Sequence, residues 1–588
     1  MAGSSVSPVL EGGTAANPTG TGRYAILEQL LADDIHYIFG NPGTVEQGFL
    51  DALGSYPDLK YILTLQETIA VAIADGYARG RHRPAVVQLH SGVGLGNGVG
   101  MLYQAKRGGS PLVVIAGESG IRYDAMDAQM AADLVSIAKP VTKWATRVVD
   151  PTSVLRVLRR AIKIAGTAPT GPVFVALPAD VLDALNEEPI VASSTPATRA
   201  APDPSLIDEA ARLLVDGARP IIIMGDGVAM SGAQSELTRV AELLGADVWG
   251  ANSSEVNIDE THPLFRGNLG HMFGHHSTPL VEPADTVLIV GTYVFPEVFP
   301  TLTQVFAHGA RIVHIDLDAY EIAKNFPVDL GLVADPKLTL AALADTLGAQ
   351  LTASAREAAG RRIDGRRAER EQTAAAMRDA DIEARRSVPL HASDFMEALA
   401  ARLPDDAIIF DEALTFSPEV TQYLPPRRPG SFFQTRGGSL GTGIPGAIGL
   451  KLAHPDRTVV GFTGDGGSMY TIQALWTAAH HRVGAKFVIL DNGAYQLLRL
   501  NIQQYWKDLG LPENPFPESF GLGDPDLQFH DLARAMGVDS ARIETREEIG
   551  PALDRALADD RPFLIDLVVH NDVRNDVAKA KHLTAGQS

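Results

Sequence analysis

The stretch RTVVGFTGDGGSMYTIQALWTAAHHRVGAKFVILDNGA, residues 457–494, decides the fold of this chain. It opens with Arg457–Phe462, an apolar run rich in β-branched residues, which predicts a buried strand. Apolar residues then recur at three- and four-residue steps and predict one helix, which Gly484 would end. Lys486–Leu490 is predicted to be the second strand. The apolar face of the predicted helix consists of Met469, Ile472, Leu475, Trp476 and Ala479.

The end of the first of these strands predicts a ligand site. Two parallel strands joined by a helix cross over in one hand, so both strands end at the same edge of the sheet and bring Asp465 beside Asn492. Gly464, Gly466 and Gly467 leave room for a ligand to reach the backbone amides of a helix N-terminus, which favour phosphate. Asp465 and the Asn492 carbonyl offer the hard oxygen atoms that Mg²⁺ prefers when it also binds phosphate. The stretch therefore predicts a site for a metal diphosphate.

The spacing of two short motifs makes this prediction more specific. The GDG at 464–466 alone is weak, because strand-to-helix turns of any doubly wound sheet use these residue types. Followed at this spacing by the Asn-Gly at 492–493, it resembles the thiamine-diphosphate motif of the thiamine-dependent decarboxylase superfamily. The resemblance implies three Mg²⁺ ligands, namely Asp465, the Asn492 side chain and the Ala494 main-chain oxygen.

Length and composition set broader limits. At 588 residues the chain is too long for one core and is expected to form three domains. Its net charge of −21 argues against a nucleic-acid surface or an anionic membrane as partner. The absence of cysteine excludes disulfides, thiolate metal sites and cysteine nucleophiles. With no basic-then-apolar N-terminal segment and no apolar run near the ~20 residues of a spanning helix, a cytoplasmic protein is expected.

The pattern along the chain predicts an α/β protein with three doubly wound parallel-sheet domains. A Pro-rich linker near residue 202 and a charged helical connector separate the three units. The predicted boundaries are 1–20 for a disordered tail, 21–190, 203–350 and 388–572 for the three units, 351–387 for the helical linker, and 573–588 for a C-terminal tail. Predicted strands and helices outside the opening stretch include His36–Phe39, Val45–Leu53, Lys60–Leu65, Thr68–Arg79, Pro84–Leu89 and Ala407–Phe410.

Three predicted strands of the first unit deliver polar residues to one sheet edge. Asn41–Thr44, Glu67 and His90 each follow a strand, and ligands of open parallel sheets bind at that edge. Each also has an ordinary structural interpretation, because Glu67 at a helix start suits the helix dipole and a lone His90 needs only a hydrogen bond. Taken singly, these residues favour the ordinary interpretation.

Taken together, these segments resemble the benzoylformate decarboxylase-like group of the same superfamily, with acetolactate synthase-like enzymes next. The resemblance covers patches of residues 23–572. The motifs that carry it are FGNPGT at 39–44, LQE at 65–67, IADGYA at 73–78, LHSGVGLGNG at 89–98 and ALWTA at 474–478.

The resemblance implies an assembly and a set of roles. The three units would be pyrimidine-binding, central and diphosphate-binding domains, with thiamine diphosphate bridging two subunits, so that a homodimer is the minimum and a homotetramer is expected. Glu67 would hydrogen-bond the aminopyrimidine ring, His90 would donate or relay a proton, and Thr44 would orient the carboxylate of a 2-oxo acid. Leu440 would be the apolar residue on which the cofactor bends, although ordinary core is its alternative. The implied cofactor contacts are Glu67, Thr415, Gly438, Leu440, Gly464, Asp465, Gly466, Gly467, Asn492 and Tyr495.

Two positions depart from the benzoylformate decarboxylase pattern. A second active-site histidine is expected from the central unit, but its place falls on Val298, next to Glu297. An aromatic residue of the substrate pocket is likewise replaced, at about Asn501. An apolar aryl pocket is therefore not assumed.

The central unit carries three further expectations. The segment GTYVFPEVFP at 291–300 lacks the charged pattern associated with flavin-binding synthases, so no flavin is predicted. The GDG at 225–227 lacks an Asn-Gly at the required spacing and is interpreted as a structural turn. His271, His275 and His276 cluster in a Gly-rich turn, where a metal site is conceivable, but solvent-exposed loop histidines are favoured because the turn has no carboxylate.

The leading hypothesis is a thiamine-diphosphate- and Mg²⁺-dependent non-oxidative decarboxylase of a 2-oxo acid, with carboligation of the enamine to an aldehyde as a further activity that the hypothesis allows. The alternative is an acetolactate synthase-like carboligase or C–C lyase. A nucleotide-dependent dehydrogenase is disfavoured because Gly92, Gly94 and Gly96 are followed by Asn97, which breaks the dinucleotide fingerprint. A non-catalytic assembly protein is disfavoured because Glu67, Asp465 and Asn492 are all retained.

Overall fold

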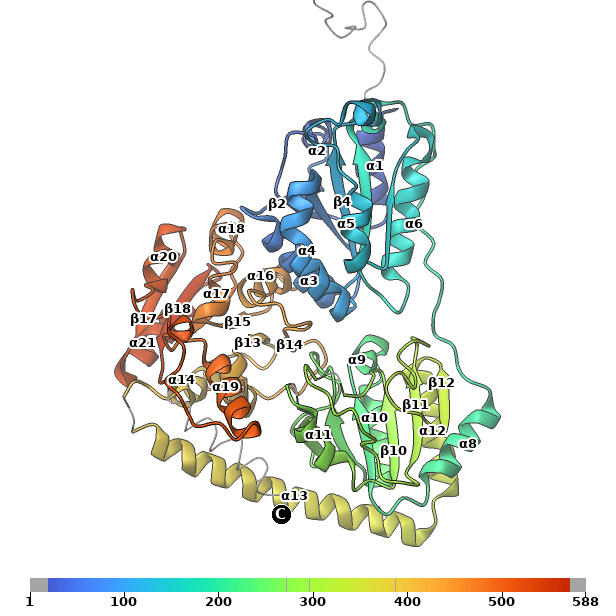
Figure 1. Cartoon of the computed structure of the whole chain (residues 1–588), viewed down its shortest axis with the longest axis vertical. Helices are drawn as coiled ribbons and strands as arrows, with labels where there is room; N and C mark the ends of the chain where they lie inside the picture. Colours follow the sequence, from blue (N-terminus) through green and yellow to red (C-terminus); the bar gives the residue numbers. More distant parts are fainter. Residues whose placement is uncertain (1–19, 271, 296, 387, 572–588) are drawn as a thin grey trace, which may run out of the picture. The chain divides into compact units, whose positions relative to one another are not determined.

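The computed structural model describes residues 20–270, 272–295, 297–386 and 388–571 (Figure 1). The chain divides into two compact units, of which the first comprises residues up to 78 and 83–196, and the second comprises 79–82 and 197 onward. His271 and nearly all of both predicted tails lie outside the described residues.

The first unit contains one six-stranded parallel sheet in the order β2-β1-β3-β4-β6-β5. Its strands are short, β3, β4 and β6 are almost wholly buried, and helices pack their apolar faces against the sheet. The strands are β1 (Tyr37–Gly40), β2 (Lys60–Leu63), β3 (Ala85–His90), β4 (Leu112–Glu118), β5 (Trp144–Arg147) and β6 (Val173–Pro178). The helices are α1 (Gly22–Ala32), α2 (Gln47–Leu53), α3 (Glu67–Arg81), α4 (Ser91–Gly108), α5 (Leu134–Ala138), α6 (Val154–Gly166) and α7 (Ala179–Asp183), with 3₁₀ turns at Ile121–Met126, Lys139–Val141 and Pro151–Ser153.

The second unit contains two sheets of the same kind. The second sheet has the order β12-β11-β10-β7-β8-β9 and buries apolar clusters on both faces. Its strands are β7 (Pro220–Met224), β8 (Asp247–Gly250), β9 (Phe265–Asn268), β10 (Thr286–Val290), β11 (Arg311–Asp316) and β12 (Leu330–Val333). Its helices are α8 (Pro204–Leu214), α9 (Gly227–Ser231), α10 (Gln234–Leu244), α11 (Gly274–Val281) and α12 (Pro336–Gln350).

The third sheet has the order β14-β13-β15-β16-β18-β17 and is also parallel throughout. Its strands are β13 (Ile408–Glu412), β14 (Phe432–Gln434), β15 (Val459–Gly464), β16 (Lys486–Asp491), β17 (Asp539–Ile543) and β18 (Phe563–Val568). Its helices are α14 (Ala392–Ala400), α15 (Ser417–Tyr423), α16 (Gly443–Ala453), α17 (Asp465–Ser468), α18 (Ala474–His481), α19 (Gln496–Asp508), α20 (Phe529–Ala535) and α21 (Arg546–Ala556), with 3₁₀ turns at Leu414–Phe416 and Glu518–Phe520. The predicted fold class, α/β with three doubly wound parallel sheets, is confirmed.

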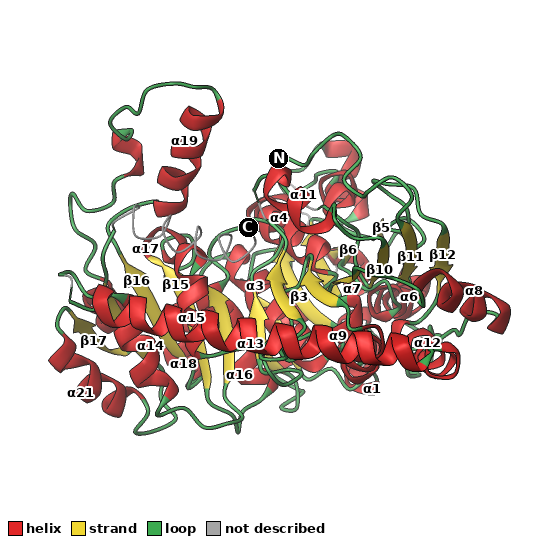
Figure 2. Ribbon diagram, turned by 90° about the horizontal axis from the view of Figure 1, so that it is seen from below, coloured by secondary structure: helices red, strands yellow, loops and turns green. Residues whose placement is uncertain are grey.

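One long helix, α13 (Ala353–Ala384), runs through the segment predicted as a linker, and Figure 2 draws it without interruption. Near its middle, Arg366 pairs with Asp247 of β8, with Nη2 at 2.6 Å from Oδ2. Near its end, the buried Asp381 accepts hydrogen bonds from Gln422 Nε2 at 2.8 Å and from the Tyr423 hydroxyl at 2.9 Å. The middle of the helix therefore contacts the second sheet, and its C-terminal part contacts a helix beside the third sheet.

The single helix predicted after β15 is wrong. The chain forms α17, turns through residues 469–473 and only then forms α18. Met469, predicted on the apolar face, is 41% exposed, and the Thr471 hydroxyl bonds the Gly441 carbonyl at 2.8 Å, outside the helix ladder. The helix stops at Arg482 in the left-handed conformation, with φ 55°, and not at Gly484. Gly484 instead lets the Asp560 backbone approach, because a Cβ there would lie 2.1 Å from the Asp560 carbonyl oxygen.

Two other predictions need correction. The helix predicted from Val45 begins only at Gln47, since the Glu46 side chain bonds to the sheet. His275 and His276 lie in the first turn of α11, a helix and not a Gly-rich turn, and both are exposed. Across the described parts of the chain, no cluster of three potential metal-ligating side chains is found.

Candidate active site

Glu67, the first residue of α3, is held by two amide side chains. Asn97 Nδ2 donates to Oε2 at 3.0 Å, and Asn41 Nδ2 lies 3.4 Å from Oε1. The residue is 6% exposed, and a Cβ at Gly94 would approach Oε1 to 2.9 Å. The structure thus places a buried carboxylate at the sheet edge, fixed by neutral donors and with no cationic partner among the described residues.

His90, the last residue of β3, is held by Glu46. The Nδ1 atom lies 3.0 Å from Glu46 Oε2, and the other oxygen of Glu46 accepts the Gly117 amide at 3.0 Å. Burial raises the pKa of Glu46, while the hydrogen bond with His90 opposes the rise. Gly43 is required here, because a Cβ would lie 1.9 Å from His90 Nδ1. The imidazole is therefore clamped between a glycine turn and a buried carboxylate.

Thr44 does not join these contacts. It lies in an exposed turn between Gly43 and Glu46, and no hydrogen bond links its side chain to another described residue.

Asp465 and Asn492, two residues of the predicted metal site, lie together at the carboxyl ends of β15 and β16. Asp465 is 4% exposed, its Oδ1 accepts the Gly466 amide at 2.7 Å, and its Oδ2 accepts the Ala494 amide at 3.1 Å. Asn492 Oδ1 accepts the same Ala494 amide at 3.0 Å, so the two side chains converge as the crossover argument requires. Burial raises the pKa of Asp465 to about 6 against the opposing backbone hydrogen bonds. The Ala494 carbonyl accepts the Gln496 amide at 2.9 Å.

Each glycine around Asp465 meets a different steric environment. A Cβ at Gly466 would lie 2.3 Å from the Tyr495 ring, so only glycine lets this aromatic residue close over α17. A Cβ at Gly464 would meet nothing within 4 Å, which leaves open space beside the buried carboxylate. A Cβ at Gly467 would lie 3.0 Å from the Thr463 hydroxyl oxygen.

A second buried carboxylate, Glu412 at the end of β13, organises the neighbouring loop. Its oxygens accept the amides of Gly441 at 2.6 Å, Thr442 at 3.1 Å and Gly443 at 2.6 Å, together with the Thr463 hydroxyl at 3.0 Å. Burial raises the pKa of Glu412, and the four donors oppose that rise. Glu412 thereby fixes one end of the loop formed by residues 437–440.

The remaining predicted cofactor residues lie around this loop. Leu440 and Thr415 are half-buried, and Gly438 is exposed with φ 80°. The role of Leu440 as the apolar residue on which the cofactor bends stays a prediction. Asn501 is half-buried on α19 and Val298 is 54% exposed, whereas the neighbouring Glu297 is buried and accepts the Ser277 hydroxyl at 2.5 Å.

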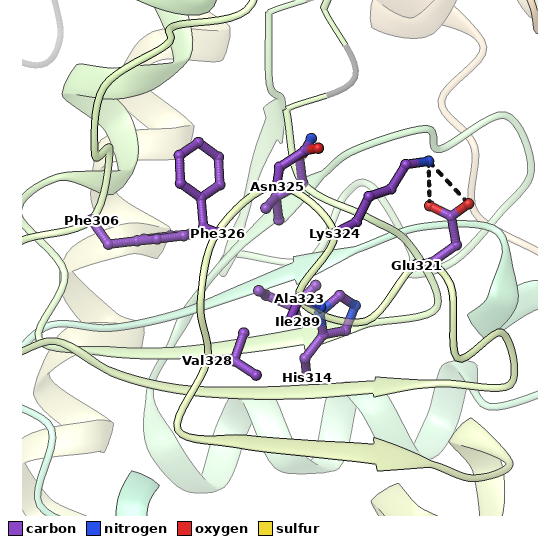
Figure 3. Close-up of a pocket in the computed structure, with 10 residues that line it drawn as sticks. Ile289, Phe306, His314, Glu321, Ala323, Lys324, Asn325, Phe326 and Val328 are labelled. Atoms are coloured by element: carbon purple, nitrogen blue, oxygen red, sulfur yellow. Dashed lines mark hydrogen bonds and ion pairs between the residues drawn. The ribbon is translucent and has the colours of Figure 1, made fainter.

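A further pocket lies in the central part of the second unit (Figure 3). His314 there is 1% exposed, with Nε2 donating to the Thr292 carbonyl at 2.9 Å and Nδ1 accepting the Ala323 amide at 3.3 Å. Burial lowers the pKa of His314 to about 4, so the ring is neutral near pH 7. Lys324 pairs with Glu321 at the rim at 3.0 Å. The polar groups of this pocket thus have hydrogen-bond or ion-pair partners within the second unit. The absence of a flavin stays a prediction.

Sequence reasoning missed Glu46 and Glu412 and gave Asn97 no role in the site. Glu46 was placed inside a predicted helix, although its position two residues after a glycine turn could have suggested an exposed carboxylate facing the sheet edge. Asn97 was considered only as a break in a dinucleotide motif, whereas its amide bonds Glu67. Nothing local singles out Glu412, because its donors come from residues 441–463.

The donor set fits the implied cofactor. Asp465 and Asn492 present hard oxygen atoms, and a cation beside the buried carboxylate would relieve its unfavourable desolvation. The fold and the site together define an enzyme of the α/β class that holds a diphosphate-bearing cofactor at the carboxyl ends of its strands.

Comparison with known families identifies that class further. Residues 20–137 match the description "Thiamine pyrophosphate enzyme, N-terminal TPP binding domain", residues 207–343 match the central domain of the same enzymes, and residues 415–567 match their C-terminal TPP binding domain. The chain therefore belongs to the thiamine pyrophosphate enzyme family. It is a thiamine-diphosphate-dependent enzyme of the benzoylformate decarboxylase and acetolactate synthase type.

Individual relatives agree with this assignment. The chain is 34% identical over 550 residues to benzoylformate decarboxylase of Pseudomonas aeruginosa. The match covers 92% of this chain and 98% of the relative. It is 30% identical over 566 residues to a probable acetolactate synthase large subunit of Methanococcus aeolicus, covering 93% of this chain and 92% of the relative.

Solved structures give the same result. Benzoylformate decarboxylase from Polynucleobacter necessarius superposes with a TM-score of 0.81 at 26% identity, over 94% of this chain and 99% of that one. A thiamine diphosphate-dependent 4-hydroxybenzoylformate decarboxylase from Rhodococcus jostii gives 0.80 at 28% identity, with the same shares covered. Within the residues described here, no helix is both long and apolar enough to cross a membrane.

Proposed function

We propose that this enzyme catalyses the Mg²⁺-dependent, non-oxidative decarboxylation of a 2-oxo acid. The observation that carries the proposal is the convergence of Asp465 and Asn492 on one backbone amide, where a buried carboxylate faces open space at Gly464. A magnesium diphosphate would supply the missing positive charge and occupy that space. The relatives named above favour an aromatic or small aliphatic 2-oxo acid as substrate.

The residues of the third sheet would bind the cofactor. Asp465, the Asn492 side chain and the Ala494 carbonyl would hold Mg²⁺, and the amides around Gly466 and Gly467 would receive the diphosphate. Thr415, Gly438, Leu440 and Tyr495 line the same edge of the sheet and would contact the rest of the cofactor. When bound, thiamine diphosphate supplies the nucleophilic carbon and the electron sink that decarboxylation of a 2-oxo acid needs.

The residues of the first sheet would move protons. Glu67 would exchange a proton with the aminopyrimidine ring, with Asn41 and Asn97 holding both of its oxygens in place. His90, with its Nδ1 engaged by Glu46, would present Nε2 as the proton donor to the carbon that has lost its carboxylate. Thr44 would orient the substrate carboxylate. Because these two sets of residues belong to different compact units, a homodimer that shares its sites between subunits, or a homotetramer of such dimers, is part of the proposal.

The direct test uses purified protein with thiamine diphosphate, Mg²⁺ and a panel of aryl and aliphatic 2-oxo acids. Release of CO₂ with formation of the matching aldehyde supports the proposal. Absence of CO₂ release from every member of the panel, with the cofactor bound, contradicts it.

Val298 favours a second candidate, carboligation of the acetolactate synthase type. A branched side chain without an ionisable group stands where the benzoylformate decarboxylase pattern has a histidine. Protonating the substrate carbon after CO₂ loss needs a positioned acid, and such acid–base catalysis is worth ~10²–10⁴-fold. With fewer acids near, that carbon has longer to react with an acceptor aldehyde.

We expect hydroxyketone to outweigh free aldehyde when an acceptor aldehyde is added to a decarboxylating reaction. Separating the two products by chromatography measures the partition, and Val298→His should shift it towards free aldehyde. Val298→Leu is the matched control, because it changes size without adding an acid. If aldehyde dominates at saturating acceptor and Val298→His leaves the ratio unchanged, position 298 does not set the outcome.

Glu46→Gln should lower turnover by about 10- to 100-fold, by analogy with the range found when a partner that fixes the tautomer of a metal-ligating histidine is replaced. Glutamine must still accept the Gly117 amide, so its NH₂ group faces His90 and reverses the tautomer of the ring. The pH profile of turnover should move as well, which a loss of stability alone would not cause. Cofactor affinity, measured by calorimetry, should stay unchanged. A wild-type pH profile in an active Glu46→Gln variant would separate Glu46 from the function of His90.

A further inference from the structure

The Gly-Asp-Gly turn after β7 contains a buried carboxylate with many partners. Asp226 is 2% exposed and accepts the amides of Ser254 at 2.8 Å and Glu255 at 3.0 Å. It also accepts the Ser254 hydroxyl at 2.5 Å and Asn257 Nδ2 at 2.9 Å. These donors all come from the loop that follows β8, so Asp226 fixes that loop to the end of β7.

The remaining partner of Asp226 comes from the third sheet. Arg436 Nη1 lies 2.6 Å from Asp226 Oδ2, and the arginine side chain is 17% exposed. Two residues earlier, the Gln434 amide donates to the Ser254 carbonyl at 2.7 Å. The chain just before residues 437–440 is therefore fastened to the central part of the second unit by a backbone bond and an ion pair.

Residues 437–440 need such external supports. Gly437 and Gly438 have φ of 74° and 80°, a backbone conformation without helix or strand bonds. After the loop, Gly441 also has positive φ, 87°, and its amide is held by Glu412 at 2.6 Å. The loop is thus anchored by one buried carboxylate on each side, Asp226 through Arg436 before it and Glu412 after it.

The Asp226–Arg436 contact persists across the neutral pH range. Burial alone would raise the pKa of Asp226, but the Arg436 charge, the Ser254 hydrogen bond, the Arg79 charge and the Asn257 hydrogen bond together hold that pKa below its usual value. Removing Arg436 leaves the Asp226 carboxylate with its donors from residues 254–257 and with the charge of Arg79, so the effect falls on the chain next to position 436. Arg436 cannot simply be lost without displacing the chain next to it.

We propose that Asp226 is a positioning residue for the cofactor site, which acts through Arg436 to hold residues 437–440 in the arrangement that accepts thiamine diphosphate. The proposal rests on the proposed function, in which Gly438 and Leu440 contact the cofactor. It gives the central part of the chain, which contributes no other residue to the cofactor site, a share in cofactor affinity.

Arg436→Met in the full chain is the main test, because it removes the loop-side partner and leaves the other bonds of Asp226 in place. If the loop adopts its binding arrangement only a tenth of the time, thiamine diphosphate affinity measured by calorimetry with Mg²⁺ falls about tenfold. Turnover at saturating cofactor should return close to the wild-type value, and Arg436→Lys should recover part of the affinity. The unfolding midpoint of the cofactor-free protein should stay within about 4 °C of wild type.

Arg427→Met is the matched control. Arg427 also pairs between the same two parts of the second unit, with Asp259 at 3.7 Å, but both side chains are largely exposed and such pairs contribute little. Its cofactor affinity should equal that of the wild type. Equal losses in both variants would overturn the proposal, because they would show no special role for the buried pair.

The remaining outcomes are also decisive. Wild-type protein that binds no thiamine diphosphate refutes the proposed function itself, whereas wild-type binding with unchanged affinity in Arg436→Met refutes only this inference. Asp226→Asn should lose affinity as well, and the double variant should lose no more than the larger single loss, since the two residues act as one unit. If Asp226→Asn does not fold, Arg436→Met decides alone.

Discussion

Replacement of Glu67 by glutamine should leave thiamine diphosphate bound and lower turnover by at least ~10²-fold, the scale of a general acid–base contribution. An amide keeps the size of the side chain but cannot take up and return a proton. Its NH₂ group would also face the Asn41 or Asn97 amide, both of which now donate to the carboxylate. The proton exchange at the pyrimidine is therefore lost while the site remains formed.

Two measurements check this expectation. Calorimetry follows cofactor binding, and NMR follows exchange of the cofactor C2 proton with solvent deuterium, which should slow in step with turnover. Glu118→Gln is the control, because Glu118 is also a buried carboxylate of the first unit but bonds Arg147. Normal C2 exchange in Glu67→Gln would contradict the assigned role.

Replacement of Asp465 by alanine should abolish most thiamine diphosphate binding. Without this carboxylate, Mg²⁺ loses its one charged ligand, and the diphosphate charge stays uncompensated beside Asn492. Titration of the cofactor with and without Mg²⁺ should show a strong metal dependence in the wild type and little in the variant. Asp456→Ala, an exposed position before β15, provides the control. An unchanged affinity in Asp465→Ala would remove the metal site from the proposal.

The same residue should affect the metal-free protein in the opposite direction. Folding raises the pKa of the Asp465 carboxyl group to about 6. Such a group destabilises the folded protein once the pH exceeds the ordinary pKa of the carboxyl group, and the destabilisation grows until the pH passes the raised pKa. Asp465→Asn should therefore raise the unfolding midpoint of the cofactor-free enzyme at pH 7.5 relative to wild type and lower it once Mg²⁺ and thiamine diphosphate are added. This reversal is the signature expected of a residue kept for binding at a cost in stability.

Much of the fold follows from local patterns. The strands before Asp465, Asn492, Glu67 and His90 are short β-branched runs, and parallel connectivity alone then brings their ends to common edges. The spacing between the GDG at 464–466 and the Asn-Gly at 492–493 then indicates the family. Local patterns failed where contacts from distant segments decide the structure, as at residues 469–473, where the Thr471 hydroxyl bonds Gly441 and the helix breaks.

The same limit applies to the site. Glu46 serves His90 from 44 residues away, and Asp226 holds Arg436 from 210 residues away. No periodicity in the sequence reports on such pairs, because each depends on which strands become neighbours in the folded sheet. The residues proposed to contact the substrate or cofactor can be picked out from the sequence. The residues that orient them, such as Glu46 and Asp226, cannot.

The long helix α13 also fixes a distance and a phase. Arg366 and Asp381, two of its anchoring residues, are 15 positions apart, which in a helix rising 1.5 Å per residue is about 22 Å. Inserting one residue between them would turn the second anchor by about 100° around the helix axis and point it away from Tyr423. Even an insertion of seven residues, which nearly restores the phase, would add about 10 Å. The number of residues between Arg366 and Asp381 therefore sets the distance and the relative direction of the two contacts. The surface residues of this segment can be replaced, but its length cannot change.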